Sequence, residues 1–191
     1  GFAALSFTAF TTAAGMSISV PAKDNASKKN KGRLKLSCQE GRIPGKTLPE
    51  KLDFLEKHGF EGIEPSGRDL PKRVEEYRKA LSGRKVRVSA VCAGFKGVPC
   101  SEKEEVRQEA MTTIKEILTA AGALGSTGMI VVPAFNKQTQ LGHKECRELC
   151  LQILPDLGEH ARKAGTRLLL EPLNRKEAYF LRQVADAAAI C

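Results

Sequence analysis

The feature of this sequence that most constrains its fold is a repeated alternation of short apolar segments with longer amphipathic ones. Each apolar segment is rich in Val, Ile and Leu and is bounded by glycine, proline or charged residues. Runs of this length and composition are typical of buried strands. The predicted strands span residues 34–38, 62–65, 86–93, 128–133 and 167–171.

The longer segments carry hydrophobic residues at helical spacing and end at recognisable helix-boundary residues. Thr47 is a good N-cap, and Pro49 and Glu50 suit the first turn of the helix that follows it. A glycine, which readily adopts the left-handed conformation, follows each of the first four helices. The predicted helices span residues 47–58, 69–81, 102–124, 144–164 and about 178–191, with Asp69 and Ser101 as further caps and Pro155 expected to kink or break the fourth.

Near-continuous apolar strands are buried on both faces, which indicates a parallel sheet covered by helices. Five strand–helix units of this kind leave two α/β architectures, a doubly wound sheet or a (β/α)8 TIM barrel. The sequence has neither the Gly-x-Gly-x-x-Gly pattern after its first strand nor a phosphate-binding P-loop, and this favours the barrel. Because a complete barrel needs about 250 residues, we predict an incomplete TIM barrel, residues 34–191, comprising about the first five units.

The first 33 residues differ from the rest in composition. Residues 1–22 carry no charge and are rich in small apolar side chains, so we expect the remnant of an export signal and a periplasmic location. If Met16 is instead the true start, the protein is cytoplasmic. The apolar stretch is too short to span a membrane, so no stable membrane insertion is expected.

Residues 23–33 are expected to form a basic flexible tail. Residues 23–35 contain six basic residues and one acidic residue, Asp24. Their net charge is +5, so +4 of the chain's net charge of +9 lies elsewhere. No aromatic residues interleave with these lysines to stack on bases, so a nucleic-acid partner is not expected.

The six cysteines include no Cys-x-x-Cys pair, so zinc-ribbon spacing is absent. Cys146 and Cys150 lie four residues apart and should share a helix face. Most cysteines are interpreted as small buried hydrophobes, and a disulfide in an exported protein is left without assigned partners. With only three histidines, a metal site built mainly from histidine is not expected.

Catalytic residues of TIM barrels follow the carboxyl ends of the strands. The most informative end is the fifth, where three leucines are followed at once by Glu171 and, six residues later, by Glu177. A charge at the edge of a core needs a cation or metal partner, and two carboxylates suit acid/base chemistry. From spacing alone, an ordinary solvated Glu171, or one paired with Arg175, is an equally good interpretation.

The segment from Glu171 to Glu177, with the sequence EPLNRKE, resembles the E-x-L/V-N-R-x-E segment of the sugar phosphate isomerase/epimerase family. This xylose isomerase-like family includes ketose 3-epimerases and hydroxypyruvate isomerase. Residues 59–64, with the sequence GFEGIE, resemble the family's second-strand entry, and residues 179–181 and 185–187 resemble its continuation. The resemblance runs from about residue 34 to residue 191.

This resemblance implies a divalent metal ion (Mn²⁺, Mg²⁺ or Co²⁺), a small-molecule sugar or hydroxy-keto substrate, and proton transfer through an enediolate. Glu171 matches the family's metal ligand and one catalytic acid/base, and Glu177 matches a catalytic-site glutamate that contacts substrate near the reacting carbon. Glu64, Cys92 and Phe135 fall where the substrate pocket is shaped, although a salt bridge for Glu64 and core packing for the other two are competing interpretations. The remaining ligands belong to strands six to eight, so the fragment itself is expected to be inactive; a homo-oligomer is compatible with this assignment.

Three alternatives stay open at this point. An apurinic-site endonuclease shares the barrel, but it needs histidines that are missing after the second and third strands. A dehydratase acting on inositol-type ketones is chemically close. A barrel that binds ligands without catalysis is the non-enzymatic alternative.

Overall fold

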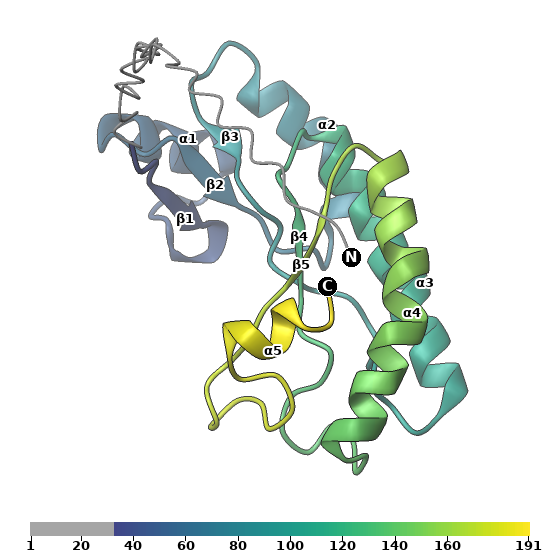
Figure 1. Cartoon of the computed structure of the whole chain (residues 1–191). Coiled ribbons are helices and arrows are strands. Elements are labelled where there is room, and N and C mark those ends of the chain that lie inside the picture. Colours follow the sequence, from purple (N-terminus) through teal and green to yellow (C-terminus); the bar gives the residue numbers. More distant parts are fainter. Residues whose placement is uncertain (1–32) are drawn as a thin grey trace, which may run out of the picture. The chain divides into compact units, whose positions relative to one another are not determined.

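A computed structural model describes residues 33–191, and the chain divides into two units, residues 1–33 and 34–191 (Figure 1). The predicted export segment and nearly all of the predicted basic tail lie outside the described residues. Within residues 33–191, no helix is long and apolar enough to cross a membrane.

Strands and helices alternate along the described residues, as the sequence pattern predicts. A short 3-10 turn follows the first strand, and one α-helix follows each of the five strands. The elements are β1 (Ser37–Gln39), η1 (Glu40–Arg42), α1 (Leu48–Lys57), β2 (Gly62–Glu64), α2 (Leu70–Leu81), β3 (Arg87–Val88), α3 (Glu104–Ala123), β4 (Met129–Val131), α4 (His143–Lys163), β5 (Leu168–Leu170) and α5 (Val184–Ala188).

All strand pairs are parallel. β1, β2 and β3 form one ladder and β4 and β5 form another. Val91 joins the two ladders, because its N–H donates to Gly128 O and its carbonyl accepts from Ile130 N, both at 2.9 Å. The strand order therefore follows the chain from β1 to β5, which confirms the predicted partial TIM barrel.

The helices cover one face of this curved sheet. α1 packs against α2, α2 against α3 and α3 against α4, while α5 is a short helix after β5 (Figure 1). The main hydrophobic core lies between these helices and the strands, and its strand residues alternate in sequence. Ile63 of β2 and Met129 and Val131 of β4 belong to this core. The residues next to each of them in the same strand therefore face the other side of the sheet.

That other, inner face is lined near the start of the strands by small residues. A Cβ on Gly62 would lie 2.7 Å from Ser37 Oγ and 3.1 Å from Ser89 Cβ. The absence of a side chain on Gly62 lets Ser37 Oγ and Ser89 Oγ hydrogen bond across β2 at 2.6 Å. The neighbouring strands are thus joined through a position where only glycine fits.

The predicted helix boundaries are correct in part. Thr47 and Glu50 form a capping box, with Glu50 N donating to Thr47 Oγ1 at 3.4 Å. The glycines after α1 to α4 all have positive φ, between 66° and 76°. Asp69 precedes α2 but makes no capping hydrogen bond, and α3 starts after Lys103 rather than after Ser101.

Several predictions about the extent of regular structure are wrong. The first strand is shorter than residues 34–38, because Leu34 is 91% exposed and has no core to face. The third strand is confined to Arg87–Val88 of the predicted residues 86–93. α4 continues through Pro155, so the break, one of the two outcomes expected there, does not occur. The predicted helix over residues 178–191 is confined to Val184–Ala188, because Ala178, Phe180 and Leu181 are buried from an irregular segment instead.

Candidate functional site

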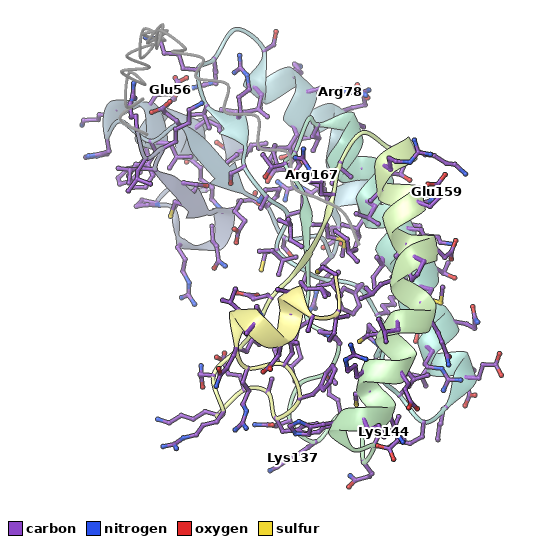
Figure 2. All side chains as sticks on the ribbon, in the orientation of Figure 1. Glu56, Arg78, Lys137, Lys144, Glu159 and Arg167 are labelled. Atoms are coloured by element: carbon purple, nitrogen blue, oxygen red, sulfur yellow. The ribbon has the colours of Figure 1, made fainter. Side chains whose placement is uncertain are left out.

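The carboxyl ends of the strands bring the candidate residues to one end of the sheet. Figure 2 shows Arg167, which precedes β5, and Lys137, which lies in the loop after β4, toward opposite ends of the strand pair. The loops after β4 and β5 meet there, because Asn136 N donates to Glu177 O at 2.7 Å. This is the end at which TIM barrels carry their catalytic groups.

Strand alternation turns Glu171 toward the inner face. Leu168 and Leu170 pack against the helix-side core, whereas Leu169 lies against Gly128, where an added Cβ would approach it within 2.5 Å. Glu171 follows on the same side as Leu169. Its backbone N–H still donates to Val131 O at 3.1 Å, so β5 holds the base of this side chain in position.

The same alternation places Gln39, Glu64 and Cys92 on the inner face. Gln39 and Glu64 are register partners at the ends of β1 and β2. The backbone of Cys92 pairs with that of Ser66 in an isolated parallel β-bridge just beyond β2, and Gln39 Nε2 lies 3.8 Å from Cys92 Sγ. Three neighbouring strand ends therefore present a carboxamide, a carboxylate and a thiol side by side.

Electrostatic coupling links Glu171 to the other groups. Partial desolvation raises the pKa of Glu171 above its ordinary value of 4.5, and the charges of Glu64 and Glu177 raise it further. Burial likewise raises the pKa of the Cys92 thiol, with contributions from Glu64 and Glu171. Glu64 and Glu177 therefore both lie close enough to Glu171, and Glu64 and Glu171 close enough to Cys92, to disfavour the ionised forms of Glu171 and Cys92.

The loop after β5 holds Glu177 through Asn174. Asn174 Oδ1 accepts from Lys176 N at 2.9 Å, its amide Nδ2 donates to the Glu177 carboxylate, and its carbonyl accepts from Glu177 N at 2.9 Å. Asn136 Nδ2 donates to the carbonyl of Arg175 at 3.1 Å, which ties this loop to the one after β4. Asn174 is therefore the centre of the turn that orients Glu177.

Of the predicted site residues, Glu64, Cys92, Glu171 and Glu177 come together. Phe135 lies on the adjoining loop after β4 and is 39% exposed, so the core-packing interpretation of this residue is wrong. Among the described residues Glu171 has no ion pair with Arg175, which removes one alternative explanation for this carboxylate.

Gln39 was not selected from the sequence. The available signal was its position as a polar residue at the end of the first strand, but only the register with β2 shows that it reaches Cys92. Glu40, its neighbour, is committed elsewhere: the Arg73 guanidinium donates two hydrogen bonds to its carboxylate, at 2.8 and 3.0 Å. Gln39 thus belongs to the site and Glu40 to the packing of α2.

The donor set fits a divalent cation in chemistry but supplies only one side of a coordination sphere. Carboxylates are suitable ligands for such ions, and Glu171 lies among other carboxylates. No group of three His, Cys, Asp or Glu side chains within residues 33–191 is arranged to hold a metal on its own. His143 is not a ligand candidate at this end of the sheet, because its ring packs beside those of Tyr179 and Phe180.

Comparison with known proteins identifies the family. The sequence profile of the xylose isomerase-like TIM barrel family matches residues 52–191. The chain is 29% identical over 163 residues to 3-dehydro-D-guloside 4-epimerase of Escherichia coli (strain K12), covering 81% of this chain and 62% of the epimerase.

Solved structures agree with this match. The apo crystal structure of 3-keto-D-glucoside 4-epimerase from E. coli superposes with a TM-score of 0.76 at 26% identity, covering 83% of this chain and 63% of that one. The IolI protein, solved with a bound zinc atom, shares the fold with a TM-score of 0.68 at 21% identity, covering 82% of this chain and 58% of IolI. The chain thus spans less than two thirds of the length of these relatives, and it belongs to the xylose isomerase-like TIM barrel family.

Proposed function

We propose that this member of the xylose isomerase-like family supplies the Glu171 side of the active site of a metal-dependent sugar epimerase or isomerase. The observation that carries the proposal is the grouping of Glu171 with Glu64 and Cys92 on the inner face, with Glu177 in the loop directly after β5. The relative that is 29% identical is named as a sugar 4-epimerase, which supports the same chemistry.

The chain's own residues suit proton transfer at a carbon that lies next to a carbonyl group. Removal of that proton leaves an enediolate, and its return to the opposite face inverts the carbon. The partial desolvation of Glu171 raises its carboxyl pKa toward neutrality, which brings this group closer to the pKa that suits an acid/base catalyst. Glu177, fixed by Asn174, would hold a substrate hydroxyl by accepting a hydrogen bond from it.

A divalent cation bound by Glu171 would act as a Lewis acid that stabilises negative charge on the substrate oxygens. The other ligands and the second catalytic carboxylate would come from the part of the relatives that this chain does not span. We therefore expect residues 34–191 alone to bind Mn²⁺ weakly and to lack turnover.

For the substrate, we favour a glycoside oxidised to a ketone at a ring carbon, with a hydroxyl-bearing carbon beside it. Both E. coli relatives carry names of this class, as a dehydro-guloside and a keto-glucoside epimerase. The carbon beside the ketone is acidic enough to be deprotonated by a carboxylate, and its hydroxyl and the carbonyl oxygen together form a bidentate ligand. A free ketose with the same arrangement is the alternative substrate.

The test is exchange of the substrate's carbon-bound hydrogen with solvent deuterium, catalysed by the full-length natural protein with Mn²⁺. A 3-keto-glucoside and a free ketose are compared, using wild type, Glu171→Gln and Glu159→Gln. Glu159 is the matched control, because it lies on the outer surface of α4 in ion pairs with Arg162 and Lys163 (Figure 2). Exchange that is lost at least 100-fold in Glu171→Gln and kept in Glu159→Gln supports the proposal.

Calorimetric titration with Mn²⁺ separates metal binding from catalysis. Tight binding to wild type and to Glu159→Gln, but not to Glu171→Gln, identifies Glu171 as a ligand. Equal Mn²⁺ affinity in all three proteins would remove the metal assignment, and an absence of deuterium exchange with either substrate class would remove the epimerase assignment.

We also propose that the protein is exported, on the basis of the uncharged, small-residue composition of residues 1–22. The measurement is the mature N-terminus of the natural protein after cell fractionation. A periplasmic protein that starts near residue 23 agrees with export, whereas a cytoplasmic protein that starts at Met16 contradicts it.

A further inference from the structure

Three buried cysteines meet where α4 packs beside the loop that precedes α3. Cys100 belongs to that loop, and Cys146 and Cys150 occupy one face of α4. Cys100 is fully buried and Cys150 is 1% exposed. Their Sγ atoms lie 3.7 Å apart, although the residues are 50 positions apart in sequence.

The sulfur of Cys146 contacts a tyrosine hydroxyl, unlike those of Cys100 and Cys150. Its Sγ lies 3.3 Å from the hydroxyl of Tyr179, and that hydroxyl donates to the carbonyl of Leu141 at 2.6 Å. Cys100 Sγ also lies 3.5 Å from the backbone carbonyl of Cys146. The geometry thus selects Cys100 and Cys150 as a pair, whereas the sequence alone does not assign partners to any cysteine.

We propose that Cys100 and Cys150 form a disulfide bond when the chain folds under oxidising conditions. Bond formation shortens the sulfur–sulfur distance from 3.7 Å to about 2.0 Å, a change that side-chain rotation and a small shift of the loop can supply. The bond would tie the loop before α3 to the middle of α4, while Cys146 keeps its thiol and its contact with Tyr179.

The reaction consumes an oxidant of the low-molecular-weight disulfide class, such as oxidised glutathione. A thiolate of one cysteine attacks the glutathione disulfide and releases one reduced glutathione. The second protein thiolate then attacks the mixed disulfide, which releases another reduced glutathione and leaves the protein disulfide. Two electrons and two protons leave the protein in total. Because both sulfurs are covered in the folded chain, we expect the exchange to occur during folding.

Peptide mapping tests the pairing directly. Trypsin cleavage after lysine and arginine places each of the six cysteines on a different peptide, including Cys100 on residues 97–103, Cys146 on 145–147 and Cys150 on 148–162. The whole chain is refolded in a glutathione redox buffer, its free thiols are alkylated under denaturing conditions, and the digest is analysed by mass spectrometry. The expected product is 97–103 joined to 148–162, lighter by two hydrogen atoms than the two separate peptides.

Thermal unfolding provides a second readout. A bond that closes a loop of this length should raise the melting temperature of the oxidised protein by roughly 10 °C over the reduced one. Cys150→Ser should abolish this difference, and the control Cys146→Ser should keep it. Alkylated Cys100 in the oxidised wild type, or Cys100 joined to any other peptide, would overturn the proposal whatever the variants do.

Discussion

Replacing Gly122 by alanine should destabilise the fold, because α3 and α4 approach each other through backbone at this point. Gly122 lies in the last turn of α3, and an added Cβ would be 1.9 Å from the carbonyl oxygen of Ala164. Ala164 is the C-cap residue of α4, and the obstructing atom is its backbone oxygen, which cannot rotate away. The two helix ends would have to separate by more than 1 Å to reach ordinary contact.

The size of the effect follows from two opposing terms. Alanine is favoured over glycine inside a helix by about 0.5–1 kcal/mol. Overpacking of a well-packed contact costs about 1–3 kcal/mol, and a rigid backbone obstacle places Gly122 at the upper end of that range. The expected net loss for Gly122→Ala is therefore about 2 kcal/mol.

Gly158→Ala is the matched control, because Gly158 also lies inside a helix, α4, and an added Cβ there meets nothing within 4 Å. Only the helix-propensity term applies, so this variant should gain about 0.5–1 kcal/mol. Urea unfolding of both variants, followed by circular dichroism with the m-value fitted freely, gives the two changes in unfolding free energy. Equal stability of Gly122→Ala and Gly158→Ala would refute the backbone contact between α3 and α4.

Three further predictions test other parts of the chain. Thr47→Ala removes the capping box of α1 and should lower the unfolding free energy by about 1 kcal/mol, which an unchanged urea midpoint would contradict. Burial raises the pKa of Glu40, but the hydrogen bonds and charge of Arg73 outweigh burial and hold the pKa below 4.5. The ionised Glu40 therefore stabilises the fold fully above pH 4.5, and this stabilisation is lost as the pH falls through the folded-state pKa. Glu40→Gln should therefore cost about 2 kcal/mol at pH 7 and progressively less in acid, and a pH-independent difference would exclude the ionised pair. Glu171→Gln should lower the pKa of Cys92 and speed its alkylation, measured on tryptic residues 88–96, whereas Glu159→Gln should leave the rate unchanged.

The order of strands and helices could be predicted because each unit carries its own local signal. The Thr47 cap and the glycines after four helices act within one turn of chain, so they operate in the same way whatever the tertiary context. The segment from Tyr179 to Leu181 could not be predicted, because its side chains pack in a core formed with α4 and the loop before α3. Burial at such long range overrides the helical appearance of the sequence.

The candidate site follows the same division. Glu171 is a candidate chiefly because residues 171–177 resemble the family segment, since its position directly after a strand fits a solvated carboxylate equally well. Its proximity to Glu64 and Cys92, and the inclusion of Gln39, depend on strand register and on which face each residue takes. The Cys100–Cys150 contact likewise needs α4 to be packed against a loop 50 residues earlier in the chain.

The charges at the mouth of the partial barrel give a physical reason for the proposed metal. The inner face begins with Ser37, Gly62 and Ser89, which are small and neutral, and ends at Glu171, whose pKa is raised by partial desolvation and by the charges of Glu64 and Glu177. Desolvation is the larger cause at Glu171 and at the Cys92 thiol, and Arg175 makes no ion pair with Glu171. A bound divalent cation would reverse the sign of the local field and favour the ionised form of Glu171 that repulsion now disfavours. Metal affinity should therefore rise steeply with pH through the pKa of Glu171, because the cation and the proton compete for the same carboxylate.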